Sequence, residues 1–154
     1  MTAAVLEPLD ARIVRLLAAD GRLSFAELGR QTGLSTSAAH QRVRRLEERG
    51  VLVGYSARVD SHQVGLDITA FVSIRPIDPS QPDDSPERLA GLDEITSCYS
   101  VAGDESYILH VQVATPLHLE DLLARIRAVA NVSTRTTMVL STPFEHRPPA
   151  MPSS

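Results

Sequence analysis

The residues of this sequence best suited to hydrogen-bond recognition lie in one arginine-rich stretch. Ser37, Gln41 and Arg44 recur every three or four residues, so they share one side of the chain if this stretch is helical. Arg can bind guanine through two hydrogen bonds, Gln can pair with adenine, and a Ser hydroxyl can bond a base or a phosphate. The spacing therefore predicts contacts with nucleic acid. The full set of predicted contact residues is Thr36, Ser37, His40, Gln41, Arg44 and Arg45.

The opposite side of the same stretch is apolar. Ala39, Val43 and Leu46 fall on one narrow stripe at 100° per residue, so one face can be buried while the other stays polar. A polar helix face on its own also fits an ordinary solvated helix. The residues on either side of the stretch distinguish between these two interpretations.

Capping residues around the stretch predict two short helices joined by a tight turn between Ser24 and Arg49. Ser24 followed by Glu27 fits a capping box, in which each side chain satisfies a free backbone donor of the other residue. Gly33 is suited to end the first helix and Ser35 to begin the second, which Gly50 then ends. A helix, a Gly-containing turn and a second helix are typical of a helix-turn-helix unit, whose second helix enters the major groove.

Charge is distributed unevenly along the 154 residues. The net charge is −4, but residues 1–50 hold eight Arg against six acidic residues, whereas residues 51–154 hold seven Arg against thirteen. The first part, at +2, is suited to a polyanion, and the second part, at −6, is suited to another task. Because +2 is modest, strong binding to DNA requires more than one copy of the first part.

Several kinds of chemistry are excluded or disfavoured by composition. All fifteen basic residues are Arg, so Lys-dependent chemistry is absent, and no nucleophile elbow, P-loop or GxGxxG occurs. The five His residues lack metal-ligand spacing and Cys98 is the only cysteine, so we expect no metal site, no cofactor and no enzyme. No apolar run is long enough for a membrane span, and the first residues lack a basic signal region, so the expected location is the cytoplasm.

The pattern on either side of the two predicted helices completes the first domain. Leu9, Ile13, Leu16 and Leu17 predict an amphipathic helix over residues 10–19. Residues 51–59 (VLVGYSARV) are rich in β-branched residues and predict a strand or hairpin arm, the wing of a winged helix-turn-helix. Residues 60–65 read as a connector.

The second half alternates between strand and helix patterns. Strands are predicted at 68–75, 95–102, 106–115 and 132–141, with a proline-rich loop at 75–86 and a Gly-Asp turn at 103–105. Ser85-Pro86 predicts the start of a short helix to Leu92, and Thr115-Pro116 the start of a longer one. The order βαββαβ predicts a ferredoxin-like arrangement, and therefore an α+β protein.

The expected domains follow from these patterns. Residues 1–50 form the helix-turn-helix domain, 51–65 a strand linker, 66–142 the ferredoxin-like domain, and 143–154 an irregular proline-rich tail.

In order and spacing, these motifs resemble the Lrp/AsnC (feast/famine) family of transcriptional regulators. The resemblance implies dimers that bind double-stranded DNA and assemble further, often into octamers, through a C-terminal domain that pairs by its sheet and binds amino acids. The pieces that carry it are LD at Leu9-Asp10, DGR at Asp20–Arg22, GLS at Gly33–Ser35, RVRRLEERGVLVGY at Arg42–Tyr55 and GDESY at Gly103–Tyr107.

The resemblance places an amino-acid effector site at the Gly-Asp turn and the last strand. There, backbone N–H groups of the turn can bind a carboxylate and Asp104 can accept from an ammonium group. This chain departs from the family pattern, because Ser106 stands where an Asp commonly precedes the Tyr. An ordinary hairpin turn is the alternative interpretation of GDES. The implied effector residues are Gly103, Asp104, Glu105, Ser106, Tyr107, Thr134 and Thr136.

Two functional hypotheses follow. The first is a sequence-specific, amino-acid-responsive transcriptional regulator. The second is a ferredoxin-like small-molecule-binding domain whose helical half only mediates oligomerisation; this hypothesis predicts no salt-sensitive DNA binding.

Overall fold

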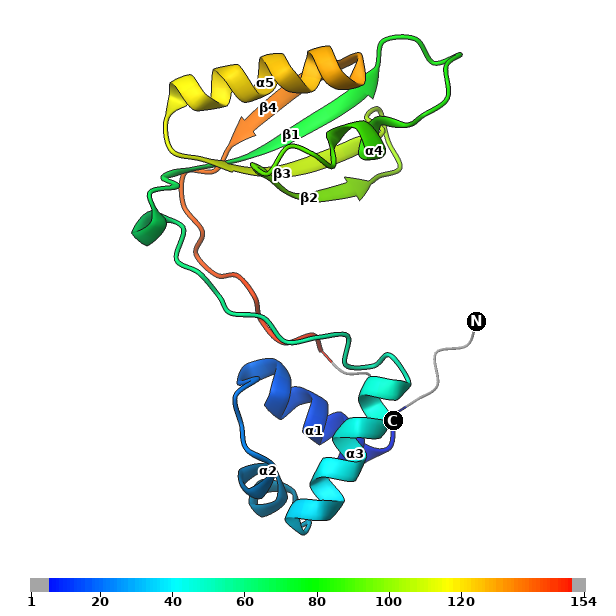
Figure 1. The fold of residues 1–154 in the computed structure, drawn as a ribbon, viewed down its shortest axis with the longest axis vertical. Coiled ribbons are helices and arrows are strands. Elements are labelled where there is room, and N and C mark those ends of the chain that lie inside the picture. Colours follow the sequence, from blue (N-terminus) through cyan, green and yellow to red (C-terminus); the bar gives the residue numbers. More distant parts are fainter. Residues whose placement is uncertain (1–5, 151–154) are drawn as a thin grey trace. The chain divides into compact units, whose positions relative to one another are not determined.

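The computed structural model describes residues 6–150 and divides into two compact units (Figure 1). One unit contains the chain up to Arg58 together with the segment from Pro143 onward, and the other spans Val59–Thr142. Residues 1–5 and 151–154, the outermost parts of the expected first domain and tail, lie outside the described residues.

The first unit is a cluster of three helices, as the sequence predicts. They are α1 (Pro8–Ala19), α2 (Phe25–Thr32) and α3 (Thr36–Glu48). Each helix presents an apolar stripe to the others, and burying these stripes together provides most of the driving force for folding this unit. The buried residues are Ile13, Val14, Leu17, Leu28, Ala39, Val43 and Leu46.

Local capping fixes the turn between α2 and α3. Gly33 adopts a left-handed conformation with φ of 74° at the end of α2, and the Ser35 hydroxyl accepts a hydrogen bond from the Ala38 N–H at 3.2 Å. Gly29 lets the two helices approach closely, because a Cβ at this position would lie 2.6 Å from the carbonyl oxygen of Leu34. These residues orient α3 relative to α2.

The predicted capping box is only half formed. The Ser24 hydroxyl accepts from the Glu27 N–H at 3.1 Å, as expected. The Glu27 side chain instead binds Arg30 and Gln31, whose charged and amide donors compete successfully with the backbone of Ser24.

The predicted strand or wing at residues 51–59 is wrong. The segment pairs with no strand of the described chain and is exposed beyond Leu52. β-branched composition favours an extended backbone, but a strand also needs a partner for its hydrogen bonds, and none is provided here. Residues 139–150 likewise form no helix or strand.

The second unit has the predicted βαββαβ order. Its elements after the short 3₁₀ turn His62–Val64 are β1 (Ile68–Pro76), α4 (Ser85–Leu89), β2 (Ile95–Ser100), β3 (Tyr107–Val113), α5 (Pro116–Ala130) and β4 (Val132–Met138). The four strands form one sheet in the order β2-β3-β1-β4, with every neighbouring pair antiparallel. This order is the ferredoxin-like topology.

Both helices of this unit cover the same face of the sheet (Figure 1). The alternation of β1 sends Ala70, Val72 and Ile74 into the core beneath them, together with Leu109 and Val111 of β3. The other face is open and carries Phe71 and Tyr99, which are 40% and 53% exposed.

The short helix after the proline-rich loop differs in its bounds from the prediction. It begins at Ser85 rather than using Ser85 as its cap, and it ends at Leu89. The Ser85 side chain is buried, so packing has replaced the expected capping role.

Candidate nucleic-acid interface and ligand site

The polar side of α3 is open to solvent. Ala39, Val43 and Leu46 are almost completely buried, and this fixes which face of the helix points outward. All six residues predicted to contact DNA are exposed: Thr36, Ser37, His40, Gln41, Arg44 and Arg45. The arrangement therefore offers hydroxyl, imidazole, amide and guanidinium groups along one accessible helix surface.

Two neighbours position members of this surface. The rings of Phe25 and His40 lie with centroids 4.6 Å apart, so the first residue of α2 restrains the imidazole on α3. Arg44 donates from Nε to Glu48 at 2.9 Å, one turn further along the helix. Phe25 could not be identified from the sequence, because the contact joins two helices and leaves no periodic signal.

Arg42 supports the domain from the inner side of α3. Its guanidinium bonds Asp10 at 2.7 Å and Glu7 at 3.0 Å, and these hydrogen bonds raise the pKa of Arg42. Asp10 is itself buried, so it needs this cation. Arg42 therefore braces the three-helix unit.

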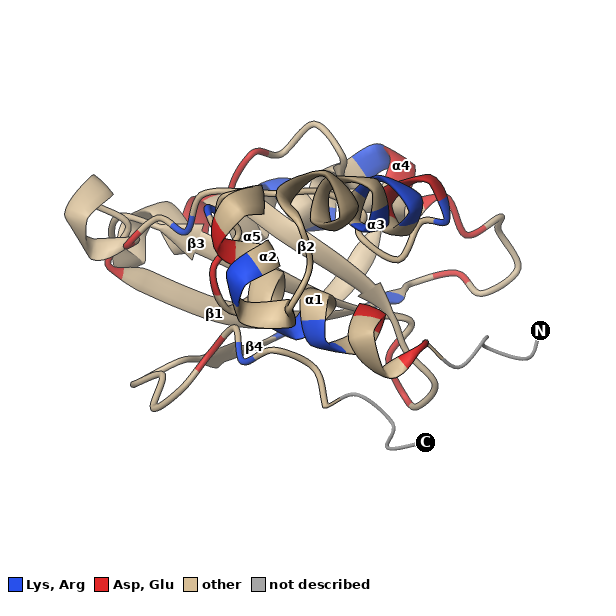
Figure 2. Cartoon of the chain, turned by 90° about the horizontal axis from the view of Figure 1, so that it is seen from below, with Lys and Arg blue, Asp and Glu red and all other residues tan. Residues whose placement is uncertain are grey.

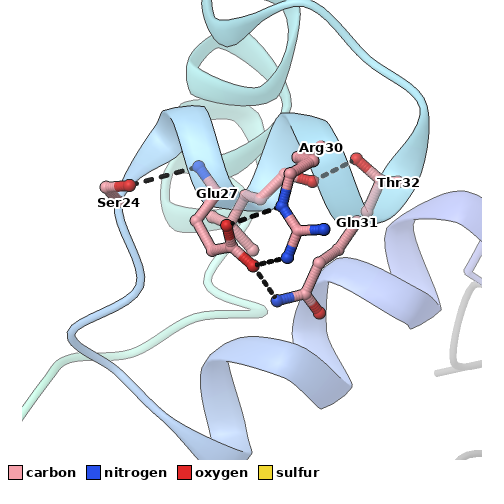
Figure 3. A network of polar contacts seen from close by, with 6 residues as sticks. Ser24, Glu27, Arg30, Gln31 and Thr32 are labelled. Carbon is pink, nitrogen blue, oxygen red and sulfur yellow. Dashed lines mark hydrogen bonds and ion pairs between the residues drawn. The ribbon is translucent and has the colours of Figure 1, made fainter.

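A second polar network lies on α2 (Figure 3). Glu27 accepts from Arg30 Nε at 2.9 Å and from Gln31 Nε2 at 2.6 Å. The Arg30 hydrogen bond, followed by that of Gln31, lowers the pKa of Glu27 to about 2. Arg30 is thereby neutralised locally, although its side chain remains exposed.

Charge in the first unit is mixed rather than uniformly basic. Arginines lie on all three helices with acidic residues between them (Figure 2). The ion pair with Asp10 compensates the charge of Arg42, whereas Arg44 and Arg45 stay on the open side of α3. Exposed arginines also lie on α1 and in the turn before α2, so the accessible positive charge is not confined to α3.

The Gly-Asp turn of the second unit is tied to the strands on each side. The Ser106 N–H donates a hydrogen bond to the carbonyl oxygen of Ile74 at 3.0 Å. The carbonyl oxygen of Ser106 accepts one from the Val101 N–H at 3.1 Å. Glu105 forms an ion pair with Arg135 of β4. The space that a Cβ would occupy at Gly103 is empty, so the turn is open there.

The remaining predicted effector residues point elsewhere. Tyr107 faces the helix-covered side, where burial, followed by the nearby carboxylate of Asp83, raises its pKa. Thr134 pairs in register with Ile74 and Thr136 with Val72, so both also face the side of the helices, and Thr134 accepts from Arg127 at 3.1 Å. Within one chain the turn and these two threonines do not form a single site.

A hollow of about 280 Å³ does lie beside the turn. It includes two predicted residues, Asp104 and Ser106, and brings in residues of two other segments that the sequence did not single out. Its lining is Arg75, Pro76, Pro79, Gln81, Asp83, Asp104 and Ser106. Both signs of charge are present, which suits a small ligand that carries both an anionic and a cationic group.

Among residues 6–150, no helix is long and apolar enough to cross a membrane. That same part of the chain contains no group of three or more His, Cys, Asp or Glu arranged to hold a metal ion.

A helix-turn-helix domain with an exposed polar second helix, joined to a ferredoxin-like domain with a polar hollow, defines a DNA-binding regulator with a ligand-binding module. Residues 6–47 match the AsnC-type helix-turn-helix domain, and residues 69–149 match the Lrp/AsnC ligand-binding domain. The chain belongs to the Lrp/AsnC family of transcriptional regulators, which are not enzymes.

Individual relatives agree with this assignment over nearly the whole chain. The transcriptional regulator LrpA of Mycobacterium tuberculosis is 56% identical over 142 residues, covering 92% of this chain and 95% of the relative. The leucine-responsive regulatory protein of Salmonella typhimurium is 34% identical over 140 residues, which cover 88% of this chain and 85% of the relative.

Solved structures show the same similarity. A feast or famine regulatory protein from M. tuberculosis, complexed with L-methionine, is 55% identical with a TM-score of 0.93, covering 96% of this chain and 100% of that one. The structure of E. coli AsnC is 29% identical with a TM-score of 0.81, and the match covers 92% of this chain and 96% of that one.

Proposed function

We propose that this protein regulates transcription by binding duplex DNA sequence-specifically through α3, under the control of an amino acid bound in the second unit. The observation that carries the proposal is the exposed polar side of α3 opposite its buried stripe. Gln41 and Arg44 are placed for base edges, and Thr36, Ser37, His40 and Arg45 for base or phosphate contacts. The cytoplasm is the location we propose, since the DNA is found there.

Self-association is part of the proposal. Residues 1–50 carry a net charge of only +2, so useful affinity requires two or more copies on one operator. The open sheet face with Phe71 and Tyr99 is the surface that we propose joins two copies. Further assembly to an octamer is what membership of the family leads us to expect.

The effector acts through the assembly in this proposal. An amino acid held at the Gly-Asp turn shifts the equilibrium between two arrangements of the copies only if it binds one of them more tightly. Each arrangement sets a different spacing of the α3 helices, and hence a different preference among operators.

The experiment is a DNA-binding measurement on the full-length protein. Genomic fragments that the protein retains are selected from a whole-genome pool, with and without each amino acid, and the affinity of a retained fragment is then measured across salt concentrations. We expect log affinity to fall linearly with log salt, by about 0.9 per phosphate neutralised. Affinity that does not change with salt would overturn the DNA-binding proposal and favour a helical half that only mediates oligomerisation.

Substitution of Arg44 tests the helix assigned to recognition. Arg44→Ala should weaken binding to the retained fragment by about 1–3 kcal/mol if the side chain reads a base, and should relax the preference at one position of the site. The matched control is Arg88→Ala, since Arg88 is also a partly exposed arginine in an i,i+4 pair but belongs to α4. Equal affinity for the two variants would remove Arg44 from the interface.

A further inference from the structure

The hollow beside the Gly-Asp turn is built by three segments that are distant in the sequence. Arg75 and Pro76 come from the end of β1, Asp104 and Ser106 from the turn, and the third wall consists of Pro79, Gln81 and Asp83 of the proline-rich loop. A volume of about 280 Å³ is enough for the charged head of an amino acid, although it is small for a whole drug-sized ligand.

Arg75 is the available cation in this hollow. Within residues 6–150 no carboxylate oxygen lies within 4.0 Å of its guanidinium, and the side chain is exposed. Two other arginines of the unit are engaged instead, Arg135 by Glu105 and Arg88 by Asp84. Arg75 therefore keeps its fork of donors for a carboxylate brought by a ligand.

Asp83 brings a second carboxylate to the hollow, from a segment other than the turn. Asp104 and Ser106 of the turn line the same hollow as Asp83. Asp83 lies near Tyr107, the first residue of β3, and its carboxylate, after burial, contributes to raising the pKa of that phenol. Pro79 and Pro82 limit the conformations of the loop, which lowers the entropy cost of holding Asp83 there.

We propose that Asp83, together with Asp104 of the turn, accepts the ammonium group of the effector, and that Arg75 binds the effector's carboxylate. This assignment rests on the proposed function, because it presupposes an amino-acid effector at this end of the second unit. It makes the proline-rich loop a specificity-determining wall of the site. It also requires an effector whose amino and carboxyl groups are both free.

The test is calorimetric titration of the full-length protein, first with L-methionine and then with the other nineteen amino acids. The amino acid that binds most tightly is titrated again as its decarboxylated amine and as its N-acetyl derivative. The variants are Asp83→Asn and Arg75→Gln, with Asp84→Asn as the control, since Asp84 is adjacent but pairs with Arg88.

We expect Asp83→Asn and Arg75→Gln each to weaken binding of the free amino acid about tenfold, the scale of a charge-assisted hydrogen bond. Asp84→Asn should change affinity less than about twofold. The loss of affinity caused by Asp83→Asn should disappear for the N-acetyl derivative, which has no ammonium group. The loss of affinity caused by Arg75→Gln should disappear for the amine, which has no carboxylate.

Failure of the two proposals can be told apart. If the unaltered protein binds none of the twenty amino acids, the proposed effector response falls and this assignment falls with it. If the unaltered protein binds and the two variants match Asp84→Asn, only this assignment is overturned. A loss of the same size for all three ligand forms would also overturn it, because it would mean that the side chains maintain the loop rather than recognise the charged groups.

Discussion

At the scale of residues, two arginines of one helix have different tasks because of where the helix points them. Arg42 and Arg44 are two positions apart, a rotation of about 200°, so one faces α1 and the other faces solvent. Arg42 satisfies the buried carboxylate of Asp10, whereas Arg44 has only an exposed partner, Glu48, on its own helix.

The first prediction compares how much each of these two arginines contributes to the free energy of unfolding. Arg42→Met leaves the buried Asp10 carboxylate with only the more distant Arg49, at 4.0 Å, and should lower the free energy of unfolding by about 2 kcal/mol. Arg44→Met removes only an exposed ion pair and should change it by less than about 0.5 kcal/mol. Urea denaturation of both variants measures the difference, and equal midpoints would show that Arg42 does not brace the domain.

Glu27 gives a prediction about pH. Its pKa is about 2 in the folded protein, below the ordinary value of 4.5, mainly because Arg30 donates to the charged form. A lowered pKa means that the carboxylate stabilises the fold fully above about pH 4.5 and loses this contribution as the pH falls through 2. The stability difference between the unaltered protein and Glu27→Gln should therefore shrink over this window.

The direct measurement is an NMR titration of the Glu27 carboxyl carbon. A midpoint near 4.5 for Glu27 would contradict the network drawn in Figure 3.

At the scale of elements, the angle between α2 and α3 depends on Gly29. Because a Cβ there would meet the backbone of Leu34 at 2.6 Å, the two helices can take their positions only around a residue without a side chain. The sequence pattern pointed to Gly33 and Gly50 as helix ends, and did not single out Gly29 inside a helix.

The corresponding prediction is a loss of stability in Gly29→Ala. The extra methyl group forces the turn away from α2, at a cost of about 1–3 kcal/mol, which exceeds the gain in helix propensity. Gly91→Ala is the control, since its Cβ position has no heavy atom within 4 Å and its φ is not in the left-handed region. A Gly29→Ala variant as stable as Gly91→Ala by thermal denaturation would refute the close approach.

At the scale of the whole molecule, the two faces of the sheet differ in what covers them. The helices bury one face, and the other leaves Phe71 next to His110 with ring centroids 5.3 Å apart. An aromatic surface of this kind is costly to leave in water, and this is the physical reason for proposing that a second copy covers it.

We therefore predict that Phe71→Glu weakens self-association. Sedimentation velocity should show a shift toward smaller species, because a charge buried in the interface has no partner there. Leu117→Glu places the same charge at an exposed position of α5, on the helix side of the domain, and should leave the distribution unchanged. If both variants sediment like the unaltered protein, the open face is not the interface.

The sequence alone determined the elements whose causes are local. The cap at Ser24, the left-handed Gly33 and the alternation of β1 act over two to four residues, so helices, strands and their order could be read from the pattern. The same pattern separated the exposed side of α3 from its buried stripe. It failed at residues 51–59, where composition suggested a strand that has no pairing partner in the described chain.

Only the tertiary structure decided the contacts between distant residues. Arg42 binds Asp10, and the ring of Phe25 lies against that of His40. Arg75 and Asp83 line the hollow at the turn, whereas Thr134 and Thr136 lie elsewhere, on the helix-covered side of the sheet. These outcomes depend on how helices and strands pack across the fold, and no spacing along the chain encodes the distance between side chains on separate elements.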